Sequence, residues 1–318
     1  MQAEGLEHGL KIDSPVPVTA VPHPWRGYFY VAAATLCWGA AATVSKAMFA
    51  GRMFPGQPMI TPLVLAQTRT TVAVLLLIPF LLLRRPATLR IRRSDFLFCL
   101  VTGTLGLAGS NFFYYWAIQK TTVAIAITVQ YTAPVWVLLA MAARGRQRAT
   151  GWRLGSVILA IAGTALTIGL FHSGVSLNAA GVAAALMASF SFAFYNIAGQ
   201  GLVQRYPPLT VMVYALLGAA LMWACVNPPS RLAAAHYSTG QWTFLMIFAM
   251  MATLVPYVFY FNGLKYLDPT RAVVTGCLEP VFAILLALIF VGEGLTGLQA
   301  LGIAAVLAAT VLAQMARG

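Results

Sequence analysis

The stretch "VVTGCLEPVFAILLALIFV" (273–291) decides the fold class of this chain. It is long and apolar enough to be a transmembrane helix, because about 20 mainly apolar residues cross the roughly 30 Å hydrocarbon core of a bilayer. Near its middle it carries Glu279, the one charged residue of the stretch, followed directly by Pro280. A carboxylate and a helix-breaking proline are both costly inside a membrane span, so each of them needs a structural or functional reason.

The remainder of the chain has the same membrane character. Of its 318 residues, 60% are hydrophobic and only 8% are charged, with a mean hydropathy of +0.81, which excludes an ordinary soluble domain. The sequence predicts an all-α integral membrane protein with ten transmembrane helices. The predicted spans are 28–49, 62–83, 96–118, 122–143, 152–170, 180–203, 209–226, 241–264, 270–291 and 296–315.

The net charge of +13 indicates orientation in the membrane. Residues 1–27 are polar and rich in proline, and we expect them to form a disordered cytoplasmic tail. With this tail inside, ten crossings place the carboxyl terminus and fifteen of the twenty basic residues on the cytoplasmic side. This asymmetry follows the positive-inside rule and predicts contact with membrane lipid, so it requires no nucleic-acid partner. The fifteen residues are Lys11, Arg26, those within 84–93 and 144–153, Arg205, Lys265, Arg271 and Arg317.

Motifs for cofactor or metal chemistry are missing from the sequence. No GxxxxGK[ST] phosphate loop occurs, and the four cysteines fall inside predicted helices without the spacing of metal ligands. No paired carboxylates suggest a catalytic site either. We therefore expect no cofactor, no metal site and no catalytic residue, and we predict that the protein is not an enzyme.

An internal duplication organises the chain. A shift of 146 residues sets "YWAIQKTTVAIAITVQYTAPVW" (115–136) beside "FNGLKYLDPTRAVVTGCLEPVF" (261–282), so that Pro134 meets Pro280 and Ala133 meets Glu279. We predict two repeats, 28–170 and 171–318. Each contains five crossings, and because five is odd the second repeat must be inverted relative to the first. Inverted repeats are the architecture of secondary transporters, whose substrate site lies between the repeats near the bilayer midplane.

Three features together resemble a known family. They are "CWGAAATVSK" (37–46), a short fourth and ninth helix each with an internal proline, and "EPVFAILLALIFVGEGLTGLQALG" (279–302). The chain is similar to the ten-helix drug/metabolite transporter superfamily and to its EamA-type exporters, most of all to aromatic amino-acid exporters of the YddG type. The resemblance implies a small-molecule exporter of the bacterial inner (plasma) membrane. The charge distribution predicts cytoplasmic termini, and the small-residue runs leave a monomer or a homodimer open.

The two internal prolines predict where the transport pathway lies. A proline removes one backbone N–H, so Pro134 leaves the carbonyl of Gln130 unpaired and Pro280 leaves that of Gly276 unpaired. Inside a membrane such groups are tolerated where they face protein or a water-filled cavity. We predict that Pro134, Pro280 and the charged residue Arg69 act in gating or as hinges. The alternative is that both prolines merely shape the bundle.

Polar and aromatic residues at mid-helix depth predict the substrate site. Aromatic walls with a few amide, hydroxyl and charged groups suit an amphipathic organic solute better than an inorganic ion. Any single ring has packing as its alternative role. The predicted substrate or cavity residues are Trp38, Lys46, Asn111, Tyr114, Gln130, Tyr131, Asn196, Tyr257, Tyr260 and Glu279.

The charges at this depth leave several arrangements open. Glu279 could contact Lys46 or Arg69 across the repeat interface, which would be a gate if the contact formed in one access state only. It could also belong to a permanent buried pair or be protonated and hydrogen-bonded to backbone. Alternatively, Lys46 could meet the carboxylate of an amino-acid substrate, with Glu279 near its ammonium group.

These observations predict a secondary transporter that exports small amphipathic metabolites by alternating access, with aromatic or hydrophobic amino acids as the expected substrates. The alternatives within the same superfamily are an exporter of drugs or hydrophobic cations and an exchanger of phosphorylated sugars or nucleotide sugars, since Arg271 could reach an anionic group. A channel and a membrane-embedded enzyme are the rival classes.

Overall fold

The described residues of the protein form helices joined by short turns and irregular connections, as predicted for an all-α protein. The structure is a computed structural model that describes residues 24–49, 53–121, 123–170, 178–291 and 296–315. The predicted tail therefore lies almost wholly outside the described residues, but 24–27 are helical because Pro24 suits a first helical turn. The elements are α1 (Pro24–Phe49), α2 (Pro62–Arg84), η1 (Pro86–Leu89), α3 (Arg93–Val101), η2 (Thr102–Ala108), α4 (Gly109–Lys120), α5 (Val123–Gln130), α6 (Ala133–Ala143), α7 (Gly151–Thr167), α8 (Ala179–Val203), α9 (Pro208–Val226), α10 (Pro229–Ala233), α11 (Thr239–Ala249), η3 (Met250–Leu254), α12 (Val255–Tyr266), α13 (Pro269–Gly276), α14 (Leu278–Val291) and α15 (Gly297–Met315).

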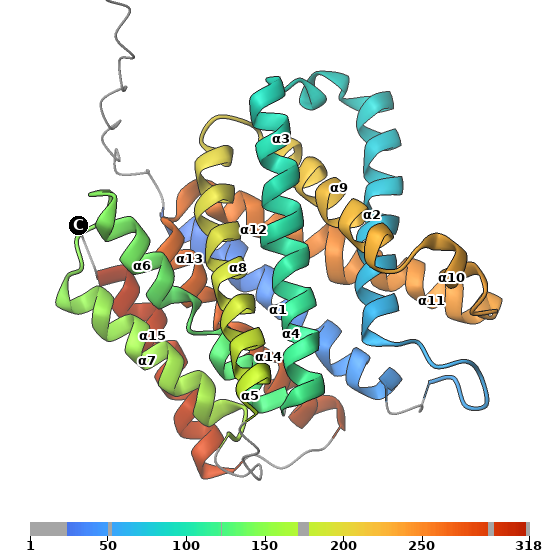
Figure 1. The fold of residues 1–318 in the computed structure, drawn as a ribbon. Coiled ribbons are helices and arrows are strands. Elements are labelled where there is room, and N and C mark those ends of the chain that lie inside the picture. The colour runs from blue at the N-terminus through green and yellow to red at the C-terminus, as the bar shows by residue number, and fades with distance from the viewer. Residues whose placement is uncertain (1–23, 50–52, 122, 171–177, 292–295, 316–318) are drawn as a thin grey trace, which may run out of the picture.

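These elements build the ten predicted spans. In the described parts of the chain, nine helical segments are long and apolar enough to cross a membrane, and the shorter apolar helix α7 supplies the tenth. The third span runs from 93 to 120 through α3, η2 and α4, and the eighth runs from 239 to 266 through α11, η3 and α12. The helices are strongly tilted relative to one another (Figure 1).

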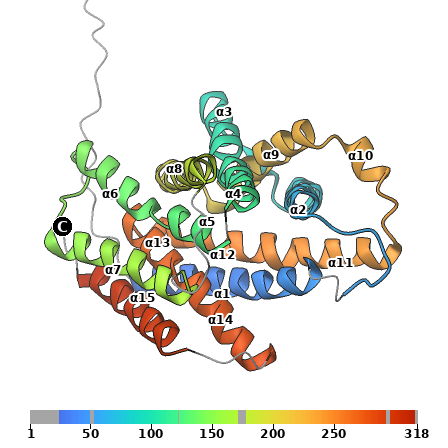
Figure 2. The same ribbon diagram turned by 60° about the horizontal axis from the view of Figure 1, so that its bottom comes forward.

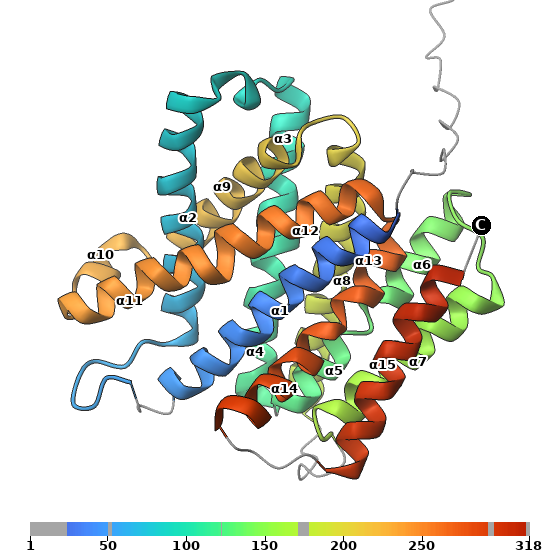
Figure 3. The ribbon, with the colours of Figure 1, turned by 180° about the vertical axis from the view of Figure 1, so that it is seen from behind.

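The packing of the spans repeats across the two halves. Helix α1 of the first half packs against α12, α13 and α14 of the second half, and α8 of the second half packs in the same way against α4, α5 and α6 of the first (Figures 2 and 3). Helix α2 packs on α9, and α7 packs on α15 along its length. Exchange of equivalent contacts between halves is what a two-fold relation between inverted repeats produces.

Both broken spans break at equivalent positions. The fourth span is interrupted at 131–132 between α5 and α6, and the ninth is interrupted at Cys277 between α13 and α14. Residues 131 and 277 are 146 apart, which is the offset of the duplication. Pro134 and Pro280 both lie in the first turn of the half-helix that follows, where a proline costs no intrahelical hydrogen bond. Each proline therefore starts a new helix rather than kinking a continuous one.

A second pair of equivalent irregularities was not predicted. The third and eighth spans each contain a π-helical segment, η2 (Thr102–Ala108) and η3 (Met250–Leu254), which overlap under the same offset of 146 residues. Such segments widen the helix by one residue and are frequent at functional sites. In each span the segment lies immediately before the part that carries predicted site residues, Asn111 in α4 and Tyr257 in α12.

Candidate functional site

One large cavity occupies the interface between the two halves. Its volume is about 1360 Å³, and it is lined from α1, α2, η2, α4, α5, α8, α9, α11, α12, α14 and α15. It extends to exposed residues at one end of the bundle, including Thr61 at the start of α2 and Gln119 near the end of α4. None of its described lining residues comes from the connections 85–92, 144–150, 204–207 or 267–268, which define the opposite end, called here the basic end.

Most of the predicted site residues line this cavity. The half-helix break in each repeat faces it, since Tyr131 adjoins the first break and Glu279 adjoins the second. The side chain of Lys46 lies outside the described residues. The predicted residues that line the cavity are Trp38, Arg69, Asn111, Tyr114, Gln130, Tyr131, Tyr257, Glu279 and Pro280.

The sequence predicts that Asn196 and Tyr260 line the cavity, but the structure places both behind its wall, where they are 0% exposed. The hydroxyl of Tyr260 donates to Oδ1 of Asn196 at 2.5 Å, and Nδ2 of Asn196 donates to the carbonyl of Phe192 at 2.8 Å. The two side chains thus satisfy each other's polar groups, and the Trp38 ring covers Tyr260 at 5.2 Å between centroids. Pro134 is likewise buried away from the cavity, in the first turn of α6.

Glu279 is held at the cavity by the other repeat. The hydroxyl of Tyr131 donates to Oε2 of Glu279 at 3.0 Å, joining the two breaks in the helices. A Cβ at Gly39 would lie 3.0 Å from the carbonyl oxygen of Glu279 and 2.8 Å from the amide nitrogen of Ala283. The backbone of α1 therefore packs directly against the first turns of α14.

Arg69 is held by the third span. Its Nη2 donates to Oδ1 of Asn111 at 3.3 Å, and Nδ2 of Asn111 in turn donates to the carbonyl of Leu107 at 2.8 Å, inside the π-helical segment η2. Beside it, Nε2 of Gln130 donates to Oγ of Ser110 at 2.9 Å. The π-helical segment thus places the carbonyl that orients Asn111, and through it the guanidinium group.

The gate contact between Arg69 and Glu279, one of the open alternatives, is not made. Among the described residues the ion pairs within 4.0 Å do not include one between these two side chains. Both side chains nevertheless line the same cavity. The site therefore contains an acidic and a basic side chain that line one space without forming an ion pair.

Aromatic rings form most of the remaining wall. Trp38 and Tyr257 contact each other edge-to-face at 5.3 Å, and Tyr195 stacks on Tyr260 at 6.1 Å. Sequence reasoning missed Trp223 and Phe248, which also line the cavity, since nothing in their local sequence shows which way these rings face. The other aromatic lining residues are Phe112, Tyr114, Tyr115, Trp116, Tyr131 and Phe192.

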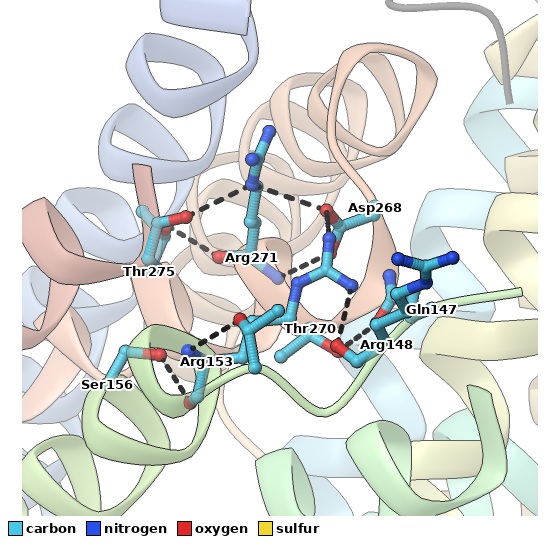
Figure 4. A network of polar contacts seen from close by, with 10 residues as sticks. Gln147, Arg148, Arg153, Ser156, Asp268, Thr270, Arg271 and Thr275 are labelled. Carbon is cyan, nitrogen blue, oxygen red and sulfur yellow. Dashed lines mark hydrogen bonds and ion pairs between the residues drawn. The ribbon is translucent and has the colours of Figure 1, made fainter. Parts of the chain in front are cut away.

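The basic end is closed by a polar network between the repeats (Figure 4). Asp268 pairs with Arg153 at 3.7 Å and with Arg271 at 3.3 Å, and it also caps α13 by accepting from the amide of Arg271 at 3.0 Å. Close by, Oγ1 of Thr270 donates to Oε1 of Gln147 at 2.7 Å. Arg153 and Gln147 belong to the first repeat and the other three residues to the second, so the network bridges the two.

A second, more exposed set of contacts lies at the same end. Arg205 pairs with Asp95 at 2.9 Å, and the hydroxyl of Tyr206 donates to the other oxygen of that carboxylate at 2.6 Å. The pKa of the Tyr206 phenol is raised, chiefly by this hydrogen bond to Asp95. Thr210 at the start of α9 donates to the carbonyl of Thr88 at 2.6 Å. The cavity is thus reached from one end of the bundle and closed at the other.

A central cavity that is reached from one end of an inverted-repeat helical bundle, with a closed polar layer at the other end, defines a multi-pass membrane transporter. The chain belongs to the EamA-like transporter family, which it matches over residues 25–169 and 179–315. Both predictions, of superfamily and of EamA type, are confirmed.

Curated relatives agree with this assignment. The chain is 31% identical over 272 residues to the threonine/homoserine exporter RhtA of Salmonella typhimurium, covering 84% of this chain and 85% of the relative. It is 30% identical over 276 residues to RhtA of Escherichia coli strain K12, covering 85% and 86%. A crystal structure of a protein with 22% sequence identity shares the fold, with a TM-score of 0.71 over 92% of this chain and 98% of the other.

Proposed function

We propose that this protein exports neutral amino acids across the bacterial inner membrane by alternating access, without changing them chemically. The observation that carries the proposal is the cavity of about 1360 Å³ at the two helix breaks, which is closed at one end by contacts between the repeats. The relatives that export threonine and homoserine support an amino acid as the solute.

The distribution of charge supports an orientation. The basic end carries the arginines of 84–93 and 144–153, together with Arg205, Lys265 and Arg271. By the positive-inside rule this end faces the cytoplasm, so both termini are cytoplasmic and the cavity opens to the outside. The structure then represents the outward-open state of the export cycle.

The cavity wall favours amino-acid substrates whose side chains are apolar or aromatic. Its many rings offer stacking surfaces, and its volume exceeds what a small hydroxyl amino acid fills. We therefore keep aromatic and hydrophobic amino acids within the proposed range and add threonine-like solutes on the strength of the relatives.

Exchange of sugar phosphates or nucleotide sugars is less well supported. Arg271, which suggested it, lies in the closed network with Asp268 and donates through Nε to the carbonyl of Ala313 at 3.1 Å. A phosphate would find Arg69 as the one basic group among the described lining residues. Export of hydrophobic cations is the second candidate, since the aromatic wall and Glu279 would suit a flat cation.

Transport in proteoliposomes tests the proposal. We expect saturable flux of phenylalanine, leucine and threonine with counterflow, compared with tetraphenylphosphonium, with and without a pH gradient. Counterflow excludes a channel, and a dependence on the pH gradient shows proton coupling. Flux of the cation with no amino-acid flux would overturn the proposal in favour of the second candidate.

A substitution at Tyr131 tests the link between the two helix breaks. Tyr131→Phe keeps the ring but removes the donor to Glu279, and we expect amino-acid transport to fall about tenfold, the effect of losing one hydrogen bond to a charged group. The control is Tyr266→Phe, which removes a hydroxyl remote from the cavity. Equal rates for the two variants in the same vesicle assay would contradict the expected role of the hydroxyl.

A further inference from the structure

We propose that Arg69 and Glu279 together recognise the zwitterionic head group of an α-amino acid, with Arg69 on its carboxylate and Glu279 on its ammonium. The inference rests on the proposed function and deepens it, because it assigns the two ends of the substrate to two named side chains. It gives Arg69 the role toward the carboxylate that the sequence left open for Lys46, whose side chain lies outside the described residues.

The described wall of the cavity offers one basic and one acidic side chain to a solute. Arg69 and Glu279 are the two charged side chains among its described lining residues, one positive and one negative. They line the same cavity but lie beyond ion-pair distance of each other. A solute with one charge of each sign would offer an opposite charge to each of these two side chains. A solute with a single charge would leave one protein charge without a partner, which is costly away from bulk water.

The surroundings of Arg69 fit a carboxylate. A guanidinium group has five N–H donors in a planar fork that matches the two oxygens of a carboxylate. Within the described part of the chain this group has one hydrogen-bond acceptor, Oδ1 of Asn111, and its Nε is buried without a partner. The capacity for a bidentate contact is therefore unused, while Asn111 and the carbonyl of Leu107 hold the group in place.

The surroundings of Glu279 fit an ammonium group. Tyr131 donates to Oε2, which fixes the carboxylate at the cavity wall, and no described residue donates to Oε1. The residue after Glu279 is Pro280, which has no backbone N–H to donate. The counterpart of Glu279 in the other repeat is Ala133. The carboxylate is thus present once, which gives the cavity a defined direction for a zwitterion instead of two equivalent ones.

The test measures direct binding to the purified full-length protein through its tryptophan fluorescence, because Trp38 and Trp223 line the cavity. Three matched ligands are titrated: phenylalanine, phenethylamine without the carboxylate, and 3-phenylpropanoate without the ammonium. In the wild type we expect each singly charged ligand to bind at least about tenfold more weakly than phenylalanine, as for loss of one charged hydrogen-bond pair.

The variants then separate the two charges. Arg69→Gln should weaken phenylalanine about tenfold to a hundredfold and leave phenethylamine within about threefold. Glu279→Gln should weaken phenylalanine similarly and leave 3-phenylpropanoate within about threefold. The matched control is Arg144→Gln, which removes an exposed positive charge at the basic end and should leave all three affinities unchanged. If a neutral variant does not fold, Arg69→Lys and Glu279→Asp keep the charge and should keep the preference for the zwitterion.

Two failures are distinguishable. Equal binding of the three ligands by the wild type, or an equal loss of all three in both variants, would overturn the assignment of charges while leaving amino-acid export intact. Binding of tetraphenylphosphonium with no binding of phenylalanine or threonine would overturn the proposed function itself.

Discussion

Asp268→Asn is expected to open the basic end of the bundle. The substitution keeps the helix cap, because asparagine accepts the amide of Arg271 as aspartate does, but it removes the negative charge that Arg153 and Arg271 share. Arg153 has a side chain that is only 8% exposed, and its Nε is buried without a partner. Its charge therefore depends on Asp268 in this closed arrangement.

The size of the effect follows from burial. Loss of one partner of a buried ion pair costs about 3–5 kcal/mol, because the other charge stays behind without compensation. Opening the basic end to water would hydrate Arg153 and relieve that cost, so the variant should favour the state that is open at this end. Even half of that free energy shifts a two-state equilibrium more than tenfold.

Labelling of Cys277 measures this opening. Cys277 is 0% exposed at the break between α13 and α14, and the other three cysteines can be replaced so that it is the one reactive thiol. We expect an aqueous maleimide to label it at least about tenfold faster in Asp268→Asn. Asp95→Asn is the matched control, because its partner Arg205 is 55% exposed and is hydrated when released, so its effect should be small. Unchanged labelling in Asp268→Asn would show that the network does not hold this end closed.

Hydropathy and the duplication predicted the architecture. Ten spans followed from apolar length, and the offset of 146 residues aligned Pro134 with Pro280. The structure adds that both prolines begin half-helices at equivalent breaks. The π-helical segments η2 and η3 could not be predicted in this way. A π-helical segment depends on how a helix packs, and the sequences "TGTLGLA" and "MMATL" share no pattern that marks it.

Depth in the membrane predicted part of the site but not which way each side chain faces. Tyr257 and Tyr260 lie on the same helix and three residues apart, which leaves their directions about 60° apart around the axis. That rotation is enough to put Tyr257 at the cavity and Tyr260 behind its wall on Asn196. Arg271 shows the same limit for charge, because its sequence position allowed a role toward anions and the structure ties it to Asp268.

Gly103→Ala is expected to destabilise the helical bundle more than a glycine-to-alanine change at any other position where the third and seventh spans meet. A Cβ at Gly103 would lie 1.8 Å from the carbonyl oxygen of Ala215, and one at Gly218 would lie 2.2 Å from that of Leu100. Between them Oγ1 of Thr104 donates to the carbonyl of Gly218 at 3.0 Å. The third and seventh spans thus meet backbone to backbone, and neither backbone can give way as a flexible side chain would.

Two opposing effects decide whether Gly103→Ala stabilises or destabilises the folded protein. Alanine favours a helix over glycine by about 1 kcal/mol, whereas an extra carbon in a tightly packed interior costs about 1–3 kcal/mol or more. At 1.8 Å from a backbone oxygen the second term must win, so we expect the melting temperature to fall by several degrees in a thermal scan of the detergent-purified protein.

Gly155→Ala is the matched control, because it makes the same change inside a helix at a position where nothing lies within 4 Å of the added Cβ. It tests the effect of helix propensity without the close contact, and it should be neutral or slightly stabilising. Gly103 also lies in η2, one turn before the carbonyl of Leu107 that orients Asn111 and Arg69. A displaced third span should therefore weaken phenylalanine binding as well as the fold. A melting temperature for Gly103→Ala at or above that of Gly155→Ala would contradict the close contact and, with it, the proposed coupling between this helix crossing and the substrate site.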